Sequence, residues 1–187
     1  MSTSMHNGGQ EMKRRLIAGD REAYSWVFKK HHEPLLRYSR NLSGSEATAY
    51  DVLQDVFMKL WDIRSTLDPE GPIEALLYTM TRNRTLSVLR KESRVSSLGA
   101  LVVEPATEET GTAALEASEL QRRLMRWLRS LPARRREAFE LSRTHGLSHR
   151  EIGRVMGVSE RTVDAHILQA LKYLRGCLEN YRAEVGT

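Results

Sequence analysis

The sequence predicts an all-α protein made of two small helical domains joined by an acidic linker. Apolar residues recur at steps of three and four in several long stretches, whereas the alternation typical of strands is scarce. Proline is rare, with five in 187 residues. The chain has no lysine or arginine between Arg94 and Arg122, although its net charge is +5. This change in composition separates the two helical halves.

The N-terminal half opens with an extension, residues 1–20, whose start we expect to be frayed. Gly19 and Asp20 predict a break followed by an N-cap, so a helix should begin at about Arg21. Its inner face should carry Tyr24, Val27 and Phe28. Pro34 is expected to start a new helical turn, because proline fits the first turn of a helix. That turn carries Leu35, Leu36 and Tyr38.

Two further helices complete the first domain, residues 21–94. Turn-forming residues at 41–45 precede a helix expected at about 46–64. A loop at 67–72 then leads into a long helix at about 73–91. The expected buried stripe of the middle helix is Val52, Leu53, Val56, Phe57 and Leu60.

Residues 95–118 are predicted to be a flexible linker, because glutamates lie there among Gly, Ala and Thr. The second domain, residues 119–183, begins with a helix that ends at Leu131-Pro132. Its apolar stripe is Leu120, Leu124, Trp127 and Leu128. Another helix is expected at about 135–145, and Gly146 closes it.

Composition restricts the possible functions. Apolar residues make up 40% of the chain and charged residues 28%, as in soluble globular proteins, and the basic surplus favours a polyanion as partner. The single cysteine, Cys177, excludes an intrachain disulfide and fits a reducing cytoplasm. No apolar run predicts membrane insertion or a signal peptide. The histidines lack a ligand set, and no nucleophile–base pair or glycine-rich phosphate loop occurs. We therefore expect no metal, no cofactor and no enzymatic activity.

The segment 147–175 predicts a helix-turn-helix. Ser148 lies three residues before Glu151, the spacing of a capping box. Gly157 can adopt the left-handed conformation that ends this short helix, and Ser159 caps a second helix. The residues expected to pack inward are Ile152, Val155 and Met156 on the first helix, and Val163, Ile167, Ala170, Leu171 and Leu174 on the second.

The outer face of the second helix carries short polar side chains with Arg, His and Gln, which suit base edges and phosphates in a major groove. The alternative is a plain helical hairpin in which these residues are only solvated. The compact turn and the basic surroundings favour DNA binding. The candidate residues are Arg150, Ser159, Arg161, Thr162, Ala165, His166 and Gln169.

The stretch DVLQDVFMKLW, residues 51–61, has a mainly acidic face opposite its apolar stripe. Charged outer faces are often only solvated. An acidic face with a central methionine in a basic protein nevertheless suits docking on a basic partner helix. The candidate docking residues are Asp51, Gln54, Asp55, Met58, Lys59 and Asp62.

With these motifs in this order, the chain resembles an extracytoplasmic-function sigma factor of the sigma-70 family over about 22–182, apart from the linker. DVLQDVFMKLW is similar to the helix that docks on the clamp helices of RNA polymerase. IEALLYTMTRNRTLSVLRK resembles the part that opens the promoter and grips the −10 element. The segment from LPARRREAFELSR to HILQALKYLR resembles the domain that reads the −35 element.

The resemblance implies core RNA polymerase (clamp helices and flap), promoter DNA and an anti-sigma protein as partners. A basic run on the long helix can neutralise several phosphates, although such residues also favour the helix dipole. Arg82 is implied to contact DNA, and Asn83 either does so or has a structural role. The candidates for the −10 element are Arg82, Asn83, Arg84, Arg90 and Lys91. The 65–71 loop lies where the family captures a flipped base.

The chain departs from the family pattern at Ile73 and Leu76, where aromatic residues are frequent. These are either core substitutions, or the protein melts promoters differently or uses Tyr78 in their place. In the family the linker threads through the polymerase, and an acidic one would suit a basic channel, although a plain spacer has the same composition.

Two other classes of protein share parts of this pattern. MGVSERTVDAHI also resembles the reader helix of response regulators, but that class needs an α/β receiver domain. A helical interaction protein, such as an anti-sigma protein or adaptor, would not need a basic reader helix.

Overall fold

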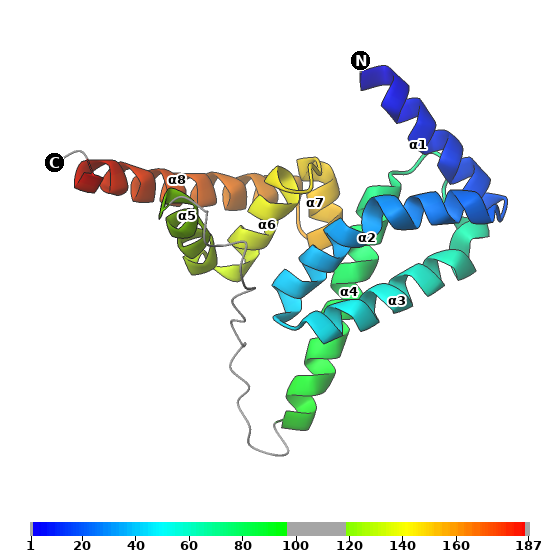
Figure 1. The fold of residues 1–187 in the computed structure, drawn as a ribbon, viewed down its shortest axis with the longest axis horizontal. Coiled ribbons are helices and arrows are strands. Elements are labelled where there is room, and N and C mark those ends of the chain that lie inside the picture. The colour runs from blue at the N-terminus through cyan, green and yellow to red at the C-terminus, as the bar shows by residue number, and fades with distance from the viewer. Residues whose placement is uncertain (1, 97–118, 186–187) are drawn as a thin grey trace. The chain divides into compact units, whose positions relative to one another are not determined.

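The computed structural model describes residues 2–96 and 119–185, and these ranges contain helices and no strand, which confirms the all-α class (Figure 1). The chain forms two compact units, residues 1–107 and 108–187, which are described separately. Most of the predicted linker, 95–118, lies outside the described residues.

The first unit contains helices α1 (Ser2–Ile17), α2 (Arg21–Ser43), α3 (Glu46–Ile63) and α4 (Ile73–Ser96), with a short 3₁₀ turn, η1 (Arg64–Thr66), after α3. The predicted N-cap of α2 is confirmed, because the Asp20 carboxylate accepts hydrogen bonds from the amides of Glu22 and Ala23. Helix α3 begins after Ser45, whose hydroxyl accepts from the Thr48 amide. Both caps satisfy backbone donors that the first turn of a helix leaves free.

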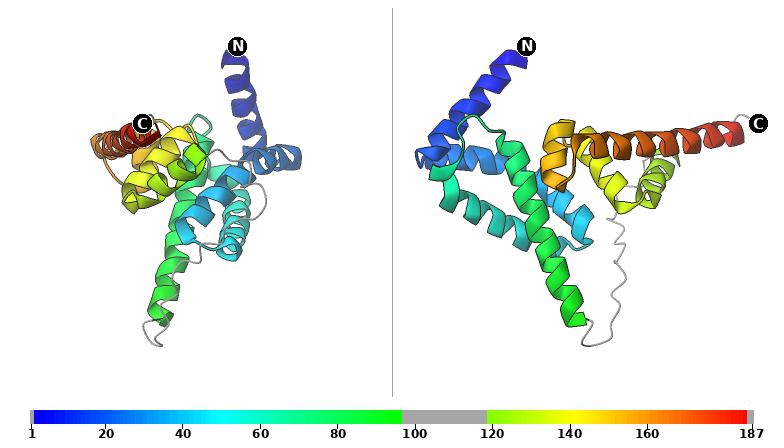
Figure 2. Two further views of the ribbon diagram at one scale, coloured as in Figure 1. Left: turned by 60° about the vertical axis from the view of Figure 1, so that its left-hand side comes forward. Right: turned by 180° about the vertical axis from the view of Figure 1, so that it is seen from behind.

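The core of the first unit lies where α2, α3 and α4 pack against one another (Figure 2). The whole predicted stripe of α3 is buried, and Leu77 of α4 is fully buried opposite it. Two of the hydroxyls within this core are paired, since those of Ser39 and Thr85 lie 2.9 Å apart and Thr85 also donates to the Thr81 carbonyl. Buried hydroxyls need such partners, because an unpaired one is costly.

Three expectations for this unit were wrong. The extension does not start frayed, because α1 begins at Ser2 and its last turns pack on α2. Pro34 does not start a helix but lies inside α2. It removes one backbone hydrogen bond, and burial of Val27 and Leu35 on either side keeps the helix continuous. Phe28 is 38% exposed, at the rim of the core rather than inside it.

The second unit contains α5 (Glu119–Ser130), α6 (Ala133–Arg143), α7 (His149–Met156) and α8 (Glu160–Val185). Its core joins α6, α7 and α8 around Leu141, Ile152 and Val163, which are fully buried. Helix α5 packs on α8, where Trp127 meets Tyr181 at 6.3 Å between ring centroids. Its apolar stripe is only partly covered, because Leu120 and Leu124 are each 40% exposed.

Candidate functional site

The predicted helix-turn-helix is formed by α7 and α8. The Ser148 hydroxyl accepts from the Glu151 amide, and the Glu151 carboxylate accepts in return from the Ser148 amide at 2.8 Å, which completes the capping box. Gly157 has φ 67°, the left-handed conformation expected of it. The Ser159 hydroxyl accepts from the Thr162 amide at 3.1 Å and so caps α8. All three local predictions are therefore confirmed.

The turn between α7 and α8 is tightly packed. A side-chain carbon at Gly153 would lie 2.9 Å from the backbone carbonyl of Val158, closer than a real contact allows. The imidazole Nδ1 of His149 also bonds the carboxylate of Asp164, so the start of α7 is tied to α8. These contacts hold the second helix at a fixed angle to the first, as a reader helix requires.

The outer face of α8 is available to a partner. Ser159, Arg161, Ala165 and Gln169 are exposed, whereas Thr162 and His166 are partly buried. The hydroxyl of Thr162 lies 2.7 Å from that of Ser159, so Thr162 also supports the cap. The residues on this face combine hydrogen-bonding groups with a single cation, as base-reading helices do.

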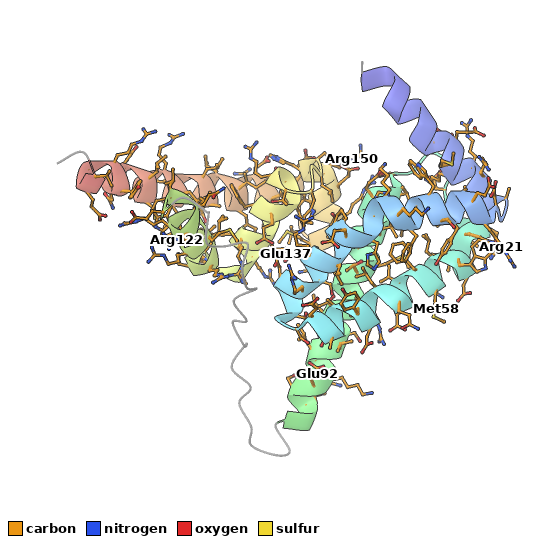
Figure 3. All side chains as sticks on the ribbon, viewed as in Figure 1. Arg21, Met58, Glu92, Arg122, Glu137 and Arg150 are labelled. Atoms are coloured by element: carbon orange, nitrogen blue, oxygen red, sulfur yellow. The ribbon has the colours of Figure 1, made fainter. Side chains whose placement is uncertain are left out.

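A shallow depression lies at the start of α8, lined by Arg150, Arg154, Gly157 and Ser159 among others. Figure 3 labels Arg150, which comes from α7. Two exposed guanidinium groups beside a helix N-terminus form a typical site for a phosphate. Arg154 was not among the DNA-binding residues predicted from the sequence. The i, i+4 spacing from Arg150 along α7 is the signal that could have found it.

The predicted −10 residues lie along α4. Asn83, Arg84, Arg90 and Lys91 are exposed, and Arg82 is partly buried. The guanidinium of Arg84 is already engaged, because its Nε donates to the Asp55 carboxylate at 2.7 Å and its Nη2 lies 2.6 Å from the same oxygen. The exposed cations toward the end of α4 are therefore the ones most open to a phosphate backbone.

The acidic face of α3 lies on the surface as predicted. Asp51, Gln54, Met58, Lys59 and Asp62 are exposed. Met58 is 59% exposed, and Figure 3 shows it on the outer side of α3. Asp55 is only partly exposed, because it forms the ion pair with α4 described above. The structure thus brings together two residues that the sequence assigned to different partners.

The 65–71 loop begins in η1 and contains a tight turn. Leu67 is buried and anchors it. The Gly71 amide donates to the Asp68 carbonyl at 3.2 Å, and the Glu70 amide donates to the Asp68 carboxylate at 3.0 Å. Asp-Pro-x-Gly is a favoured order for such a turn. Gly71 is partly buried, and the other residues of the loop, among them Ser65 and Asp68, are exposed.

The positions that depart from the family pattern lie mostly in the core. Ile73 is buried, and Leu76 is partly buried. Tyr78 is also buried and meets Tyr38 edge-on, with ring centroids 5.2 Å apart. Burial raises the pKa of the Tyr78 hydroxyl. Tyr78 therefore packs in the core and does not replace a surface aromatic, which favours the interpretation of core substitutions.

The side chains that the structure describes, at 9–94 and 119–185, include no group of three His, Cys, Asp or Glu placed as metal ligands would be. In the same ranges, no helix is long and apolar enough to cross a membrane.

Known families match both units of the chain. Residues 27–95 match the family described as sigma-70 region 2, and residues 121–174 match sigma-70 region 4. The ECF RNA polymerase sigma factor SigE of Mycolicibacterium smegmatis is 30% identical over 173 residues, which are 89% of this chain and 66% of SigE. The chain belongs to the extracytoplasmic-function group of the sigma-70 family. It is an RNA polymerase sigma factor, and the response-regulator alternative is not favoured.

Other relatives agree with this assignment. The ECF sigma factor SigK of Mycobacterium tuberculosis is 28% identical over 175 residues, covering 88% of this sigma factor and 91% of SigK. The sigma factor RpoE of Bartonella quintana, solved in complex with the anti-sigma factor NepR, has a TM-score of 0.65 at 23% identity, covering 83% of this chain and 96% of that one. CnrH, solved with the cytosolic domain of CnrY, has a TM-score of 0.63 at 22% identity, covering 91% and 97%. These two structures share the fold of this sigma factor.

Proposed function

We propose that this sigma factor binds core RNA polymerase and directs it to promoters by contacting both the −10 and the −35 element. The observation that carries the proposal is the pairing of a region 2 match with a region 4 match whose helix-turn-helix is fully capped. The first unit would bind the polymerase and the −10 element, and the second the −35 element and the flap. The protein would act in the cytoplasm and would need no chemistry of its own.

The −35 element would be read by α8. Arg161 and Gln169 would contact base edges, because both are exposed on the outer face of α8. Arg150 and Arg154 would hold phosphates at the start of α8 and so set its register on the duplex. Ser159, Thr162, Ala165 and His166 complete the proposed reading face.

The −10 element would be held by α4 and the 65–71 loop. Arg82, Asn83, Arg90 and Lys91 would follow the phosphate backbone, whereas the loop would accept a flipped base. A base out of the stack exposes its hydrogen-bonding edge, which a short loop can read. Arg84 would contact the DNA only after its guanidinium leaves the Asp55 carboxylate.

The polymerase would bind the acidic face of α3 through Asp51, Gln54, Asp55, Met58, Lys59 and Asp62. Exposed carboxylates steer a basic partner helix, and an exposed methionine adds an adaptable apolar contact. Since the structures of two similar proteins contain NepR or the cytosolic domain of CnrY, we propose that an anti-sigma protein also binds this chain.

Reconstituted transcription tests the proposal. Purified core polymerase with this protein should initiate at discrete start sites that core polymerase alone does not use. Asp51→Lys should prevent holoenzyme assembly, whereas Glu179→Lys, an equal charge reversal at an exposed site on α8, should not. Arg161→Ala combined with Gln169→Ala should retain assembly and lose selection among −35 sequences. Failure of the wild-type protein to associate with core polymerase would refute the proposal.

A further inference from the structure

Helix α1 precedes the region 2 match, which begins at residue 27, and packs against both α2 and η1. Leu16 is fully buried in this contact, and Lys13 is buried with it at 4% exposure. Burial lowers the pKa of Lys13, a change that nearby carboxylates oppose. A buried lysine is uncommon, because its ammonium loses hydration and needs a protein partner.

The partner of Lys13 is the 65–71 loop. Its ammonium donates to the backbone carbonyl of Gly71, the last residue of the loop. The next residue, Arg14, pairs with Glu70 of the same loop at 3.0 Å, but both side chains are mostly exposed. Exposed pairs of this kind contribute little. The buried Lys13 contact is therefore the one that ties the end of the loop to α1.

The start of the loop is also held. The Arg64 guanidinium lies 4.2 Å over the Trp61 ring and donates to the Trp61 carbonyl at 2.7 Å. It also lies against the α1–α2 turn, since a side-chain carbon at Gly19 would meet its Nε at 3.5 Å. Figures 1 and 2 show the connection between α3 and α4 passing beside α1. Both ends of the loop are fixed, and the exposed residues between them can face a partner.

We propose that Lys13 is a positioning residue that sets which base the 65–71 loop accepts at the −10 element. The inference rests on the proposed function, in which this loop receives a flipped base. Base reading depends on hydrogen bonds whose geometry tolerates little displacement. Because Lys13 holds a backbone carbonyl, its loss would move the loop without removing any group that touches the base. The expected result is weaker discrimination between bases rather than general loss of binding.

The experiment uses the full chain assembled with core polymerase. A promoter library randomised in the −10 element first identifies the preferred sequence and the position read by the loop. Open-complex formation is then measured on four duplexes that differ only in the base at that position. For Lys13→Met, the ratio between the best and the second-best base should fall about five- to tenfold, because a small misplacement already has effects of this size.

Two variants, Lys13→Arg and Arg15→Gln, serve as controls for Lys13→Met. Met is apolar and of similar length, so Lys13→Met should fold, and its thermal unfolding is measured in parallel. Lys13→Arg keeps a cation and should retain most of the discrimination. Arg15→Gln removes the same charge from the same helix, but Arg15 pairs with Asp20 and Glu22 rather than with the loop. It should leave the base ratio unchanged.

A fourth variant, Ser65→Ala with Asp68→Ala, separates this inference from the proposed function. If it alters base preference while Lys13→Met does not, the inference about Lys13 is wrong and the reading loop stands. If neither variant alters base preference, the loop is not the reader and both ideas fail. If Lys13→Met weakens all four duplexes equally, as a purely structural residue would, the positioning role is refuted.

Discussion

The ion pair of Asp55 and Arg84 shows at the residue scale why surface residues are hard to assign from sequence. The residues lie on α3 and α4, and each was expected to bind a different partner. Their pairing neutralises both charges in the free protein, although each side chain remains about half exposed, at 46% and 49%. A polymerase residue that binds Asp55 must therefore compete with Arg84, and a phosphate that binds Arg84 must compete with Asp55.

A double-mutant cycle measures that pairing. Asp55→Ala, Arg84→Ala and the double variant are compared by urea unfolding. We expect a coupling of about 0.5 kcal/mol, because a half-exposed pair is screened by solvent even when two guanidinium nitrogens lie within hydrogen-bond distance of one carboxylate oxygen. A coupling that is absent at low salt would contradict a persistent contact between α3 and α4. Lys59→Ala, also exposed on α3, serves as the single-charge control.

His31 gives a pH prediction. Burial lowers the pKa of its imidazole to about 4, with Lys30 adding to the effect and Glu74 opposing it. The pKa of His31 in the folded chain lies below its unfolded value of 6.5, so between these two values the unfolded chain binds a proton at His31 and the folded chain does not. The free energy of unfolding therefore falls as the pH decreases from about 6.5 to 4. Between pH 7 and 5, the wild type should lose about 1–2 kcal/mol more than His31→Gln.

Denaturant titrations of both proteins at several pH values test this. The two chains differ only at residue 31, so the difference in slope reports the His31 imidazole together with its coupling to Glu74. Parallel curves would show that the imidazole is not shielded from solvent.

At the scale of elements, the close packing of α7 against the turn that leads into α8 depends on the absence of a side chain at Gly153. Gly153→Ala should destabilise the second unit by about 1–3 kcal/mol, because its side chain would meet a backbone carbonyl that cannot move aside. Gly176→Ala in α8 is the matched control. No atom lies within 4 Å of a side-chain carbon built there. It should stabilise the protein by about 0.5–1 kcal/mol, since alanine favours helix over glycine. Thermal unfolding of both variants would show opposite shifts.

The elements differ in how well the sequence predicted them. Helix starts after Asp20, Ser148 and Ser159 were predicted because an N-cap is a local interaction between residues two or three apart. Pro34 was misassigned because local preference favours a helix start, whereas packing on both sides keeps α2 continuous. Tertiary burial overrides a single lost hydrogen bond.

For the molecule as a whole, the order of motifs along the chain was enough to predict two helical units and the family. The acidic face of α3 and the outer face of α8 were predicted from helical periodicity alone. The contacts of Lys13 with Gly71 and of Asp55 with Arg84 were not, because they join residues far apart in the chain. No pattern of spacing in the sequence encodes such contacts. They change the candidate site, because one fixes the end of the 65–71 loop and the other engages the Arg84 guanidinium.

The charge distribution of the whole chain predicts how its promoter binding depends on salt. Each phosphate that a cation neutralises adds about 0.9 to the slope of log affinity against log salt on duplex DNA, and about 0.7 on single strands. Arg90 and Lys91 are both exposed near the end of α4. Replacing both with Gln should therefore reduce the slope by about 1.4–1.8 for a holoenzyme bound to a promoter fork.

Arg84→Gln should reduce that slope by less than about 0.5, because its cation is already shared with Asp55 and displaces fewer ions from DNA. Glu92→Gln, in the same turn as Lys91, is the control and should not reduce it. Fluorescence anisotropy between about 50 and 200 mM salt gives all four slopes. A reduction of about 0.7–0.9 for Arg84, half of that for Arg90 with Lys91, would mean that DNA binding breaks the ion pair between α3 and α4. In that case the proposed polymerase-binding helix, α3, and the proposed DNA-binding helix, α4, would respond to the promoter together.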